Sequence, residues 1–168
     1  MHIRVLYKSD APLYRALRLQ ALQLNPEAYG STYEREAQFA IETVEERLQP
    51  VEGKFTLGAF DDNQALVGIV TFVREQGIKM EHKGNIYGMF VAPQAREQRV
   101  GRSLLVELIR KAKTYAGMEQ INLAVVSGNE AAKRLYQSLG FQVYGVERNA
   151  LKHNGIYYDE DFMVLKLS

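Results

Sequence analysis

The stretch Ile86–Ser103 constrains the fold of this chain most strongly, because it combines an apolar strand, a proline break and a cationic loop that leads into a helix. The loop carries three arginines, Arg96, Arg99 and Arg102, around Gly101. Backbone N–H groups stay unpaired at the start of a helix, and the helix dipole adds positive potential there. The stretch therefore predicts an anion-binding turn suited to a pyrophosphate. An ordinary strand–turn–helix with surface arginines explains this stretch equally well. The helix itself is indicated by apolar residues at helical spacing, namely Leu104, Leu105, Leu108, Ile109 and Ala112.

A second group of polar residues follows the next apolar strand, in the segment between Ser127 and Gly140. Asn129, Lys133 and Tyr136 are separated by four and three residues, which places them on one stripe of a helix. An amide and a phenol along one line suit a slender ligand that carries amide groups. Taken singly, Asn129 is better explained as a helix cap, and Tyr136 as a tyrosine with a buried ring and an exposed hydroxyl. Both groups follow the ends of neighbouring strands, where open α/β sheets bind ligands.

The remaining pattern predicts a mixed α/β fold in a single domain over residues 1–168. The expected order is a strand, two helices, a three-stranded meander, a helix, a strand, a helix and two closing strands. The central part, from the third meander strand onward, is expected to be parallel at least in part, with helices on both faces of the sheet. Asn154-Gly155 is expected to form a turn between the last two strands. The predicted strands are 2–6, 55–60, 65–74, 83–91, 121–126, 141–146 and 161–167. The predicted helices are one capped by Ser9 or Asp10 and stopped by Asn25-Pro26, one over 33–48, one over 102–116, and a short one that opens at 127–130 and ends at Gly140.

Composition and the absence of certain motifs argue against several classes of function. The formal net charge of +1 gives no reason to expect a nucleic-acid or anionic-membrane partner. No apolar run approaches the roughly 20 residues that span a bilayer, and the first residues lack the apolar region of a signal peptide, so we expect a cytoplasmic protein. The chain has no cysteine, and its three histidines lack the spacing of metal ligands, so no metal is expected. The fingerprints of phosphate-loop enzymes, dinucleotide-binding proteins and serine hydrolases are also missing.

Two segments resemble the signatures of the GNAT N-acetyltransferases. Residues 93–105 are similar to the acetyl-CoA motif of that family, which has Gln or Arg, then Gly three positions later, then Gly or Ala two further on. Arg96 and Gly101 match the first and last positions, whereas Arg99 stands where the family has a glycine. The segment 129–141, with its Asn, spaced alanines, Leu-Tyr pair and Gly-Phe ending, is closer to the second signature. The order of elements also matches the family, whose fold has two splayed central parallel strands.

The resemblance implies an acetyl-CoA cosubstrate held between the strand at 87–91 and its parallel neighbour at 121–126. Backbone groups of the first strand would pair with the pantetheine amides, the loop after it would hold the pyrophosphate, and Asn129 would bond the pantetheine arm. The residues that it implies for the cofactor are Met89, Phe90, Val91, Arg96, Glu97, Gln98, Arg99, Val100, Gly101, Arg102, Ser103, Asn129, Lys133 and Tyr136.

The resemblance further implies direct attack of a primary amine on the thioester in a ternary complex. Tyr136, whose phenol has an ordinary pKa of about 10, would donate a proton to the leaving thiolate as general acid. Many family members carry a Glu on the strand before the loop, but this chain reads Tyr-Gly-Met-Phe there, so the general base stays open among Glu81, His82, Glu36 and Asp159.

The amine acceptor is not specified by the sequence. By resemblance, Tyr29, Tyr33 and Tyr157 would line its site, although each also suits packing of a loop on the sheet. The missing glycine and the missing strand Glu favour an alternative function, an acyl-CoA-binding or regulatory module that keeps the fold without turnover. The sequence also leaves open whether the chain forms a homodimer.

Overall fold

The computed structural model describes all residues from Met1 to Ser168. Its centre is one seven-stranded sheet in the order β1-β2-β3-β4-β5-β7-β6, in which β4 and β5 are parallel and all other neighbours antiparallel. The predicted mixed sheet is therefore confirmed. The strands are β1 (His2–Val5), β2 (Lys54–Phe60), β3 (Leu66–Arg74), β4 (Lys83–Val91), β5 (Gln120–Val126), β6 (Gln142–His153) and β7 (Ile156–Lys166).

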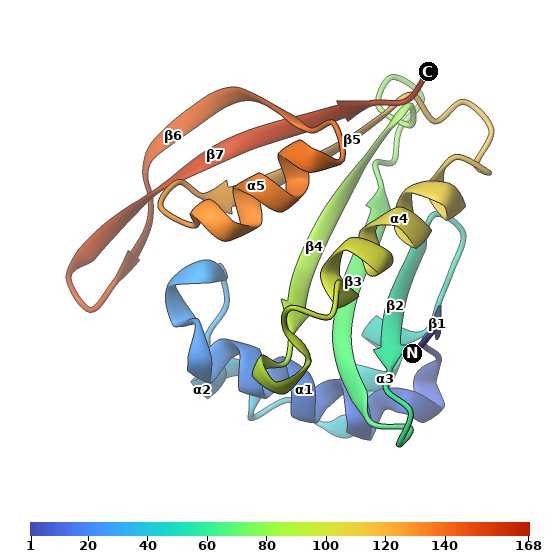
Figure 1. The fold of residues 1–168 in the computed structure, drawn as a ribbon, viewed down its shortest axis with the longest axis vertical. Helices are drawn as coiled ribbons and strands as arrows, with labels where there is room; N and C mark the ends of the chain where they lie inside the picture. The colour runs from blue at the N-terminus through green and yellow to red at the C-terminus, as the bar shows by residue number, and fades with distance from the viewer.

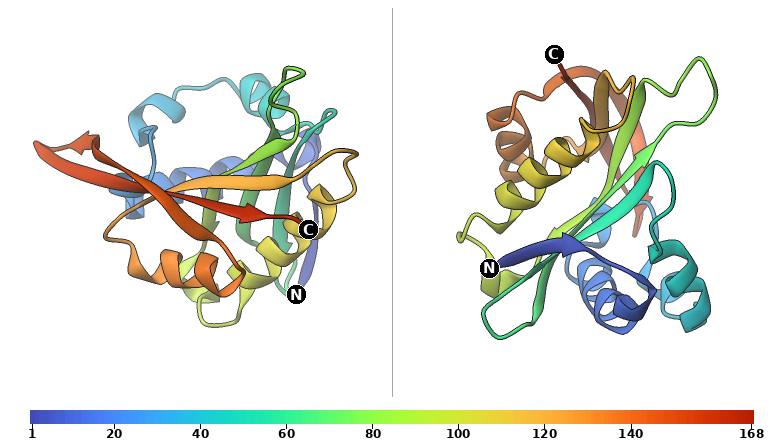
Figure 2. Two further views of the ribbon diagram at one scale, coloured as in Figure 1. Left: turned by 90° about the horizontal axis from the view of Figure 1, so that it is seen from above. Right: turned by 90° about the vertical axis from the view of Figure 1, so that its right-hand side faces the viewer.

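Helices cover both faces of the sheet. Helices α1 and α3 lie against one face of the β1–β4 half, whereas α4 and α5 lie on the opposite side (Figures 1 and 2). None of the helices is long and apolar enough to cross a membrane. The α-helices are α1 (Ala11–Leu24), α2 (Tyr33–Glu36), α3 (Ile41–Leu48), α4 (Val100–Ala112) and α5 (Glu130–Ser138), and the 3-10 turns are η1 (Lys8–Asp10), η2 (Pro26–Ala28) and η3 (Pro93–Ala95).

One expected helix is in fact two. The prediction of a continuous helix over 33–48 was wrong, because α2 ends at Glu36 and α3 begins only at Ile41. Ala40 is extended, with φ −61° and ψ 149°, which breaks the helical hydrogen bonding. Between the two helices Phe39 packs against the core, with guanidinium groups from both helices over its ring. The break therefore lies next to an aromatic side chain that packs on the core, a tertiary contact that helical periodicity does not reveal.

The last two strands are longer than the apolar pattern indicated. The predictions of 141–146 and 161–167 miss most of a polar hairpin, in which Leu151, Lys152 and His153 pair with the first residues of β7. The predicted turn at Asn154-Gly155 is confirmed, with both residues at positive φ, which suits the twist of a two-residue hairpin. Backbone pairing extends these strands beyond the region where side chains are buried, so alternation of apolar residues could not reveal it.

The core lies between the sheet and the helices on its two faces and extends from β1 to β5 and β7. Phe55 and Phe72 stack with ring centroids 5.3 Å apart, and Tyr115 stacks on both. Gly84 makes room for this cluster, since a Cβ at that position would lie 2.3 Å from the Phe72 ring. The first residues of β4 are thereby fixed close to β3.

The splay of the sheet begins just after these residues. The parallel pairing of β4 with β5 covers only Lys83–Gln120, Gly84–Ile121 and Asn85–Asn122. Beyond this point β5 stays paired with β7 as far as Val126, while β4 continues along β3 to Val91. The two strands therefore diverge into a V, which Figure 1 shows opening away from the C-terminus of the chain.

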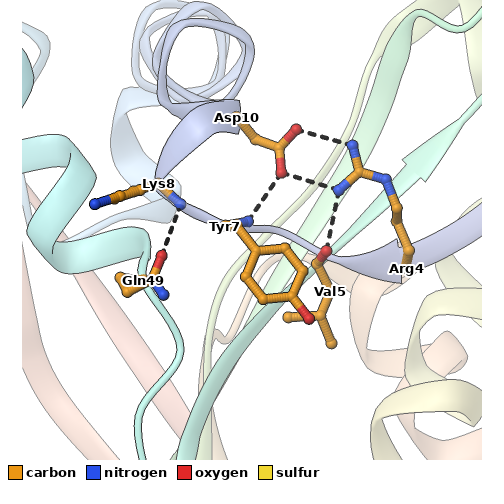
Figure 3. Close-up of polar contacts among 6 residues, drawn as sticks. All are labelled: Arg4, Val5, Tyr7, Lys8, Asp10 and Gln49. Carbon is orange, nitrogen blue, oxygen red and sulfur yellow. Dashed lines mark hydrogen bonds and ion pairs between the residues drawn. The ribbon is translucent and has the colours of Figure 1, made fainter.

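A polar network holds the start of α1 against β1 and α3 (Figure 3). The Asp10 carboxylate accepts two hydrogen bonds from the Arg4 guanidinium, at 2.9 and 2.8 Å, and a third from the Tyr7 N–H at 2.8 Å. The Lys8 N–H donates to Gln49 Oε1 at the end of α3. The hydrogen bond from Arg4 holds the pKa of Asp10 below its ordinary range, so the carboxylate stays charged at neutral pH. These bonds fix the direction in which α1 leaves β1.

Candidate active site

The V between β4 and β5 forms a cleft with a volume of about 1760 Å³. Its walls are β4, β5, the loop into α4, one side of α5, the turn η2 and the middle of β7. Such a cleft results directly from the splay, because two parallel strands that separate leave an unpaired backbone edge on each side. Polar backbone groups on these edges require partners, and a bound ligand can supply them.

The edge of β4 that faces the cleft is defined by residues 89 and 91. A β-bulge with Gly88 at φ +63° changes the register of β4 against β3. The Ala92 N–H donates to the Val67 carbonyl on β3. Because the backbone groups of successive residues alternate in direction along an antiparallel pair, the N–H and C=O groups of Phe90 point toward β3, and those of Met89 and Val91 point toward the cleft. The backbone of Phe90, expected to face the cofactor, is therefore directed away from it, and its side chain is buried.

Two side chains cap the carbonyl groups on this open edge. The Tyr29 hydroxyl donates to the Met89 carbonyl at 2.9 Å, and Arg96 Nε donates to the Val91 carbonyl at 3.1 Å. The N–H groups of Met89 and Val91 have no partner, so they are the free donors of the strand. Donors of this kind can bind an amide carbonyl or polarise a thioester oxygen.

The loop into α4 presents a run of free backbone donors. None of the N–H groups from Glu97 to Arg102 donates a hydrogen bond, and the first amide of this region to do so is that of Ser103. Glu97 and Arg99 adopt the left-handed conformation, with φ +68° and +61°, and Arg99 is the residue that precedes the helix. Successive amides turned this way and continued by a helix N-terminus form a concave anion site. The predicted anion-binding turn thus has the expected donors, although α4 begins at Val100 rather than after Gly101.

The three arginines of this loop have different surroundings. Arg96 is held on β4, and Arg102 donates to Ser138 Oγ on α5 at 2.9 Å, which links α4 to α5. The Arg99 guanidinium makes no hydrogen bond or ion pair and is exposed beside the free amides. Gln98 and Ser103 do not line the cleft; Gln98 contacts the Gln94 carbonyl, and Ser103 faces a separate groove on α4.

Gly101 brings α4 close to the neighbouring elements. A Cβ at this position would lie 3.1 Å from Met89 Cε and 3.2 Å from Leu135 Cδ2. The absence of a side chain lets β4, α4 and α5 meet at the cleft. Sequence reasoning gave Gly101 a role in ligand approach, and the structure adds this role in packing.

Helix α5 contributes Asn129 and Tyr136 to the cleft. The Asn129 side-chain oxygen accepts from the Ala132 N–H at 3.2 Å, so the residue is an N-cap, and its amide nitrogen stays free. Tyr136 is 7% exposed, its ring packs edge-on against Phe141, and its hydroxyl has no hydrogen-bond partner. Burial, with a smaller effect from Tyr29, raises the pKa of Tyr136, so the phenol carries its proton at neutral pH.

The side chain of Lys133 is bound to β7 and does not face the cleft. Its ammonium group lies 2.8 Å from the Asp161 carboxylate on β7 and donates to the Ser127 carbonyl at 3.3 Å. The residue does not line the cleft, so its expected place beside the cofactor is revised. The contact fixes α5 on β7, and the hydrogen bonds from Lys133 and Ser127 hold the pKa of Asp161 below its ordinary value.

Of the three tyrosines expected at the acceptor site, Tyr29 and Tyr157 line the cleft and Tyr33 does not. Tyr29 lies under the Arg18 guanidinium, 5.0 Å from the ring centre, and Arg18 forms a two-point ion pair with Glu36. Burial raises the pKa of Tyr29 to about 12, so its hydroxyl is a donor at neutral pH. Sequence reasoning missed Arg18, whose position on α1 gave no sign that η2 would bring Tyr29 beneath it.

The four residues considered as general base are all unsuited by their surroundings. Glu81 and His82 precede the closed end of the V and do not line the cleft. Burial would raise the pKa of Glu36, but its hydrogen bonds from Arg18 hold that pKa below the ordinary value. Asp159 lines the cleft but accepts hydrogen bonds from Arg148 and from the Asn149 N–H. No group of three histidine, aspartate or glutamate side chains that could hold a metal ion occurs in the structure.

Comparison with known proteins gives the family. The model of the acetyltransferase (GNAT) domain matches residues 3–162. This chain therefore belongs to the GNAT acetyltransferase family, as the two sequence signatures and the splayed sheet indicate.

Individual relatives are distant in sequence. The L-amino acid N-acetyltransferase AaaT of Escherichia coli is 27% identical over 119 residues, which cover 71% of this chain and 72% of that protein. An uncharacterized N-acetyltransferase of Bacillus subtilis, YoaA, is 26% identical over 98 residues, 58% of this chain, and the match spans only 54% of YoaA.

Among solved structures, YncA of Salmonella typhimurium, determined with its cofactor acetyl-CoA, superposes with a TM-score of 0.77 at 25% identity, over 100% of this chain and 94% of that one. The fold is therefore shared over the whole length of this chain.

Proposed function

We propose that this protein is an N-acetyltransferase that moves the acetyl group of acetyl-CoA to a primary amine in a ternary complex. The observation that carries the proposal is the set of free backbone donors along one wall of the cleft, from Met89 and Val91 on β4 to the amides 97–102 before α4. Their order matches a molecule with a thioester and amides at one end and phosphates at the other. Membership of the acetyltransferase family and the acetyl-CoA bound by YncA support the same assignment.

The residues present fit acetyl-CoA at each part of the molecule. The amides 97–102 and the free Arg99 guanidinium suit the pyrophosphate, and the amide nitrogen of Asn129 suits a carbonyl of the pantetheine arm. Bound there, acetyl-CoA supplies an acetyl thioester that is reactive toward amines. An N–H of Met89 or Val91 would polarise the carbonyl oxygen of that thioester.

Tyr136 is the proposed general acid. Its phenol is protonated at neutral pH, lines the cleft and has no internal partner that competes for its proton. It would donate that proton to the thiolate that leaves the acetyl group. A general acid of this kind typically contributes about 10²- to 10⁴-fold to the rate.

The test combines binding with turnover. Isothermal titration with acetyl-CoA measures the cofactor, and release of free CoA in the presence of amino acids, diamines, aminoglycosides and peptides measures transfer. We expect Tyr136→Phe to bind acetyl-CoA as the wild type does and to lose at least about 100-fold in turnover. Absence of binding at millimolar acetyl-CoA would contradict the proposal, and unchanged turnover in Tyr136→Phe would remove the assigned acid.

A second candidate is an acyl-CoA-binding or regulatory module without turnover. It is favoured by Arg99 in place of the family glycine and by the lack of a carboxylate on the open edge of β4. This function predicts acetyl-CoA binding with no CoA release for any amine in the same panel. The two measurements together therefore separate the candidates.

A further inference from the structure

On the acceptor side of the cleft, β7 contributes a carboxylate that no other residue engages, that of Glu160. Glu160 lies opposite Val126 of β5 and Glu147 of β6 in the sheet register. It lines the cleft where β5 ends, and its side chain makes no hydrogen bond or ion pair. By contrast, the cleft carboxylate Glu75 accepts from Asn85 Nδ2 at 2.8 Å.

Alternation along β7 explains why Glu160 points into the cleft. The neighbouring Asp161 reaches Ser127 and Lys133 on the side of the sheet that α5 covers. Successive side chains of a strand point to opposite faces, so Glu160 lies on the other face, where Tyr158 and Phe162 also line the cleft. The turn η2 packs against β5 and β6, and it lines the same cleft together with Tyr29.

The charges around Glu160 favour uptake of a proton. Burial, and after it the like charge of Glu147 across the strand pair, raise the pKa of Glu160 above its ordinary value. The turn η2, which packs against β5 and β6, brings only the acidic Glu27 to this region. On β5 the adjacent residues Val126 and Ser127 carry no charge, and the nearby Arg148 is bound to Asp159.

Building on the proposed function, we propose that Glu160 is the catalytic base that takes a proton from the ammonium group of the acceptor. The ammonium loses one proton to the Glu160 carboxylate and becomes a neutral amine. The amine nitrogen then forms a bond to the acetyl carbon, and the C–S bond breaks. Tyr136 gives its proton to the thiolate and recovers one from the nitrogen, which leaves a neutral amide and free thiol. Glu160 returns its proton to water, so one proton is released per acetyl group transferred.

The experiment measures kcat/KM against pH for the wild type and three variants, with the best amine from the CoA-release panel. We expect Glu160→Gln to lose about 100-fold or more at neutral pH and to recover as rising pH deprotonates the free amine. Glu147→Gln removes the like charge and so lowers the pKa of Glu160, which moves the acid limb of the profile to lower pH with activity retained. Glu46→Gln, on the exposed side of α3, is the matched control and is expected to follow the wild type.

Titration with acetyl-CoA shows whether Glu160→Gln is folded, because the base has no part in cofactor binding. Loss of activity by the same factor at every pH, with the acid limb unmoved, would assign Glu160 a structural role and overturn the proposal. Wild-type kcat/KM in Glu160→Gln would overturn it as well. If instead the wild type itself releases no CoA with any amine, the proposed function fails before the role of Glu160 is reached.

Discussion

Arg99 allows the sharpest test of the cofactor site, since it occupies a family glycine position with a left-handed backbone. Its φ of +61° and ψ of 23° cost an L-residue about 1–2 kcal/mol, whereas glycine adopts them freely. Glycine in turn loses about 0.5–1 kcal/mol through the greater freedom of the unfolded chain. Arg99→Gly should therefore raise the free energy of unfolding by at most about 1.5 kcal/mol. Arg99→Ala retains the strain and should match the wild type.

The same pair of variants separates the guanidinium from the backbone in binding. A hydrogen bond to a charged group contributes about 1.5–3 kcal/mol, and solvent at this exposed loop reduces it to about 1–2 kcal/mol. Because 1.4 kcal/mol is tenfold in Kd, both variants should bind CoA about 5- to 30-fold more weakly. The amides 97–102 remain in each, so binding should persist.

The assay is isothermal titration with CoA at two salt concentrations, together with thermal unfolding. Arg134→Ala is the control, because Arg134 is an exposed arginine on α5 that makes no ion pair and does not line the cleft. The weakening in the Arg99 variants should shrink at high salt. Wild-type affinity in both Arg99 variants would refute a guanidinium contact and leave the backbone as the whole anion site.

Two further predictions concern stability. Gly84→Ala places a Cβ 2.3 Å from the Phe72 ring and should destabilise the protein by about 1–3 kcal/mol in chemical denaturation. Gly128→Ala, whose Cβ would have no atom within 4 Å, should be as stable as the wild type. Equal denaturation midpoints for the two variants would contradict the packing argument. Asp10→Asn should lose about 1 kcal/mol at neutral pH, the half-exposed Arg4 being screened by solvent. Because the pKa of Asp10 is lowered on folding, the stability difference between wild type and Asp10→Asn should be present above about pH 4 and vanish as the pH falls through the folded pKa. Asp62→Asn, which changes an exposed ion pair, should be as stable as the wild type at every pH.

The sequence by itself determined the order of elements, the mixed sheet and the two segments that carry the family signatures. Apolar periodicity is strong where a strand or helix is buried, as in β4, which was predicted with its exact bounds. Apolar periodicity fails where backbone pairing or a single tertiary contact sets the bounds of an element, as in the polar hairpin of β6 and β7 and in the break at Ala40.

Only the tertiary structure decided which residues of the signatures face the cleft. Alternation against β3 turns the backbone groups of Phe90 away from the cleft and leaves those of Met89 and Val91 facing it. The ion pair with Asp161 holds Lys133 away from the cofactor side. The sequence did not indicate Glu160 as a base, and its register against Val126 and Glu147 places its free carboxylate on the acceptor side. Spacing along a chain fixes the face of an isolated element, but the partner strand and the packing of the next helix decide what that face meets.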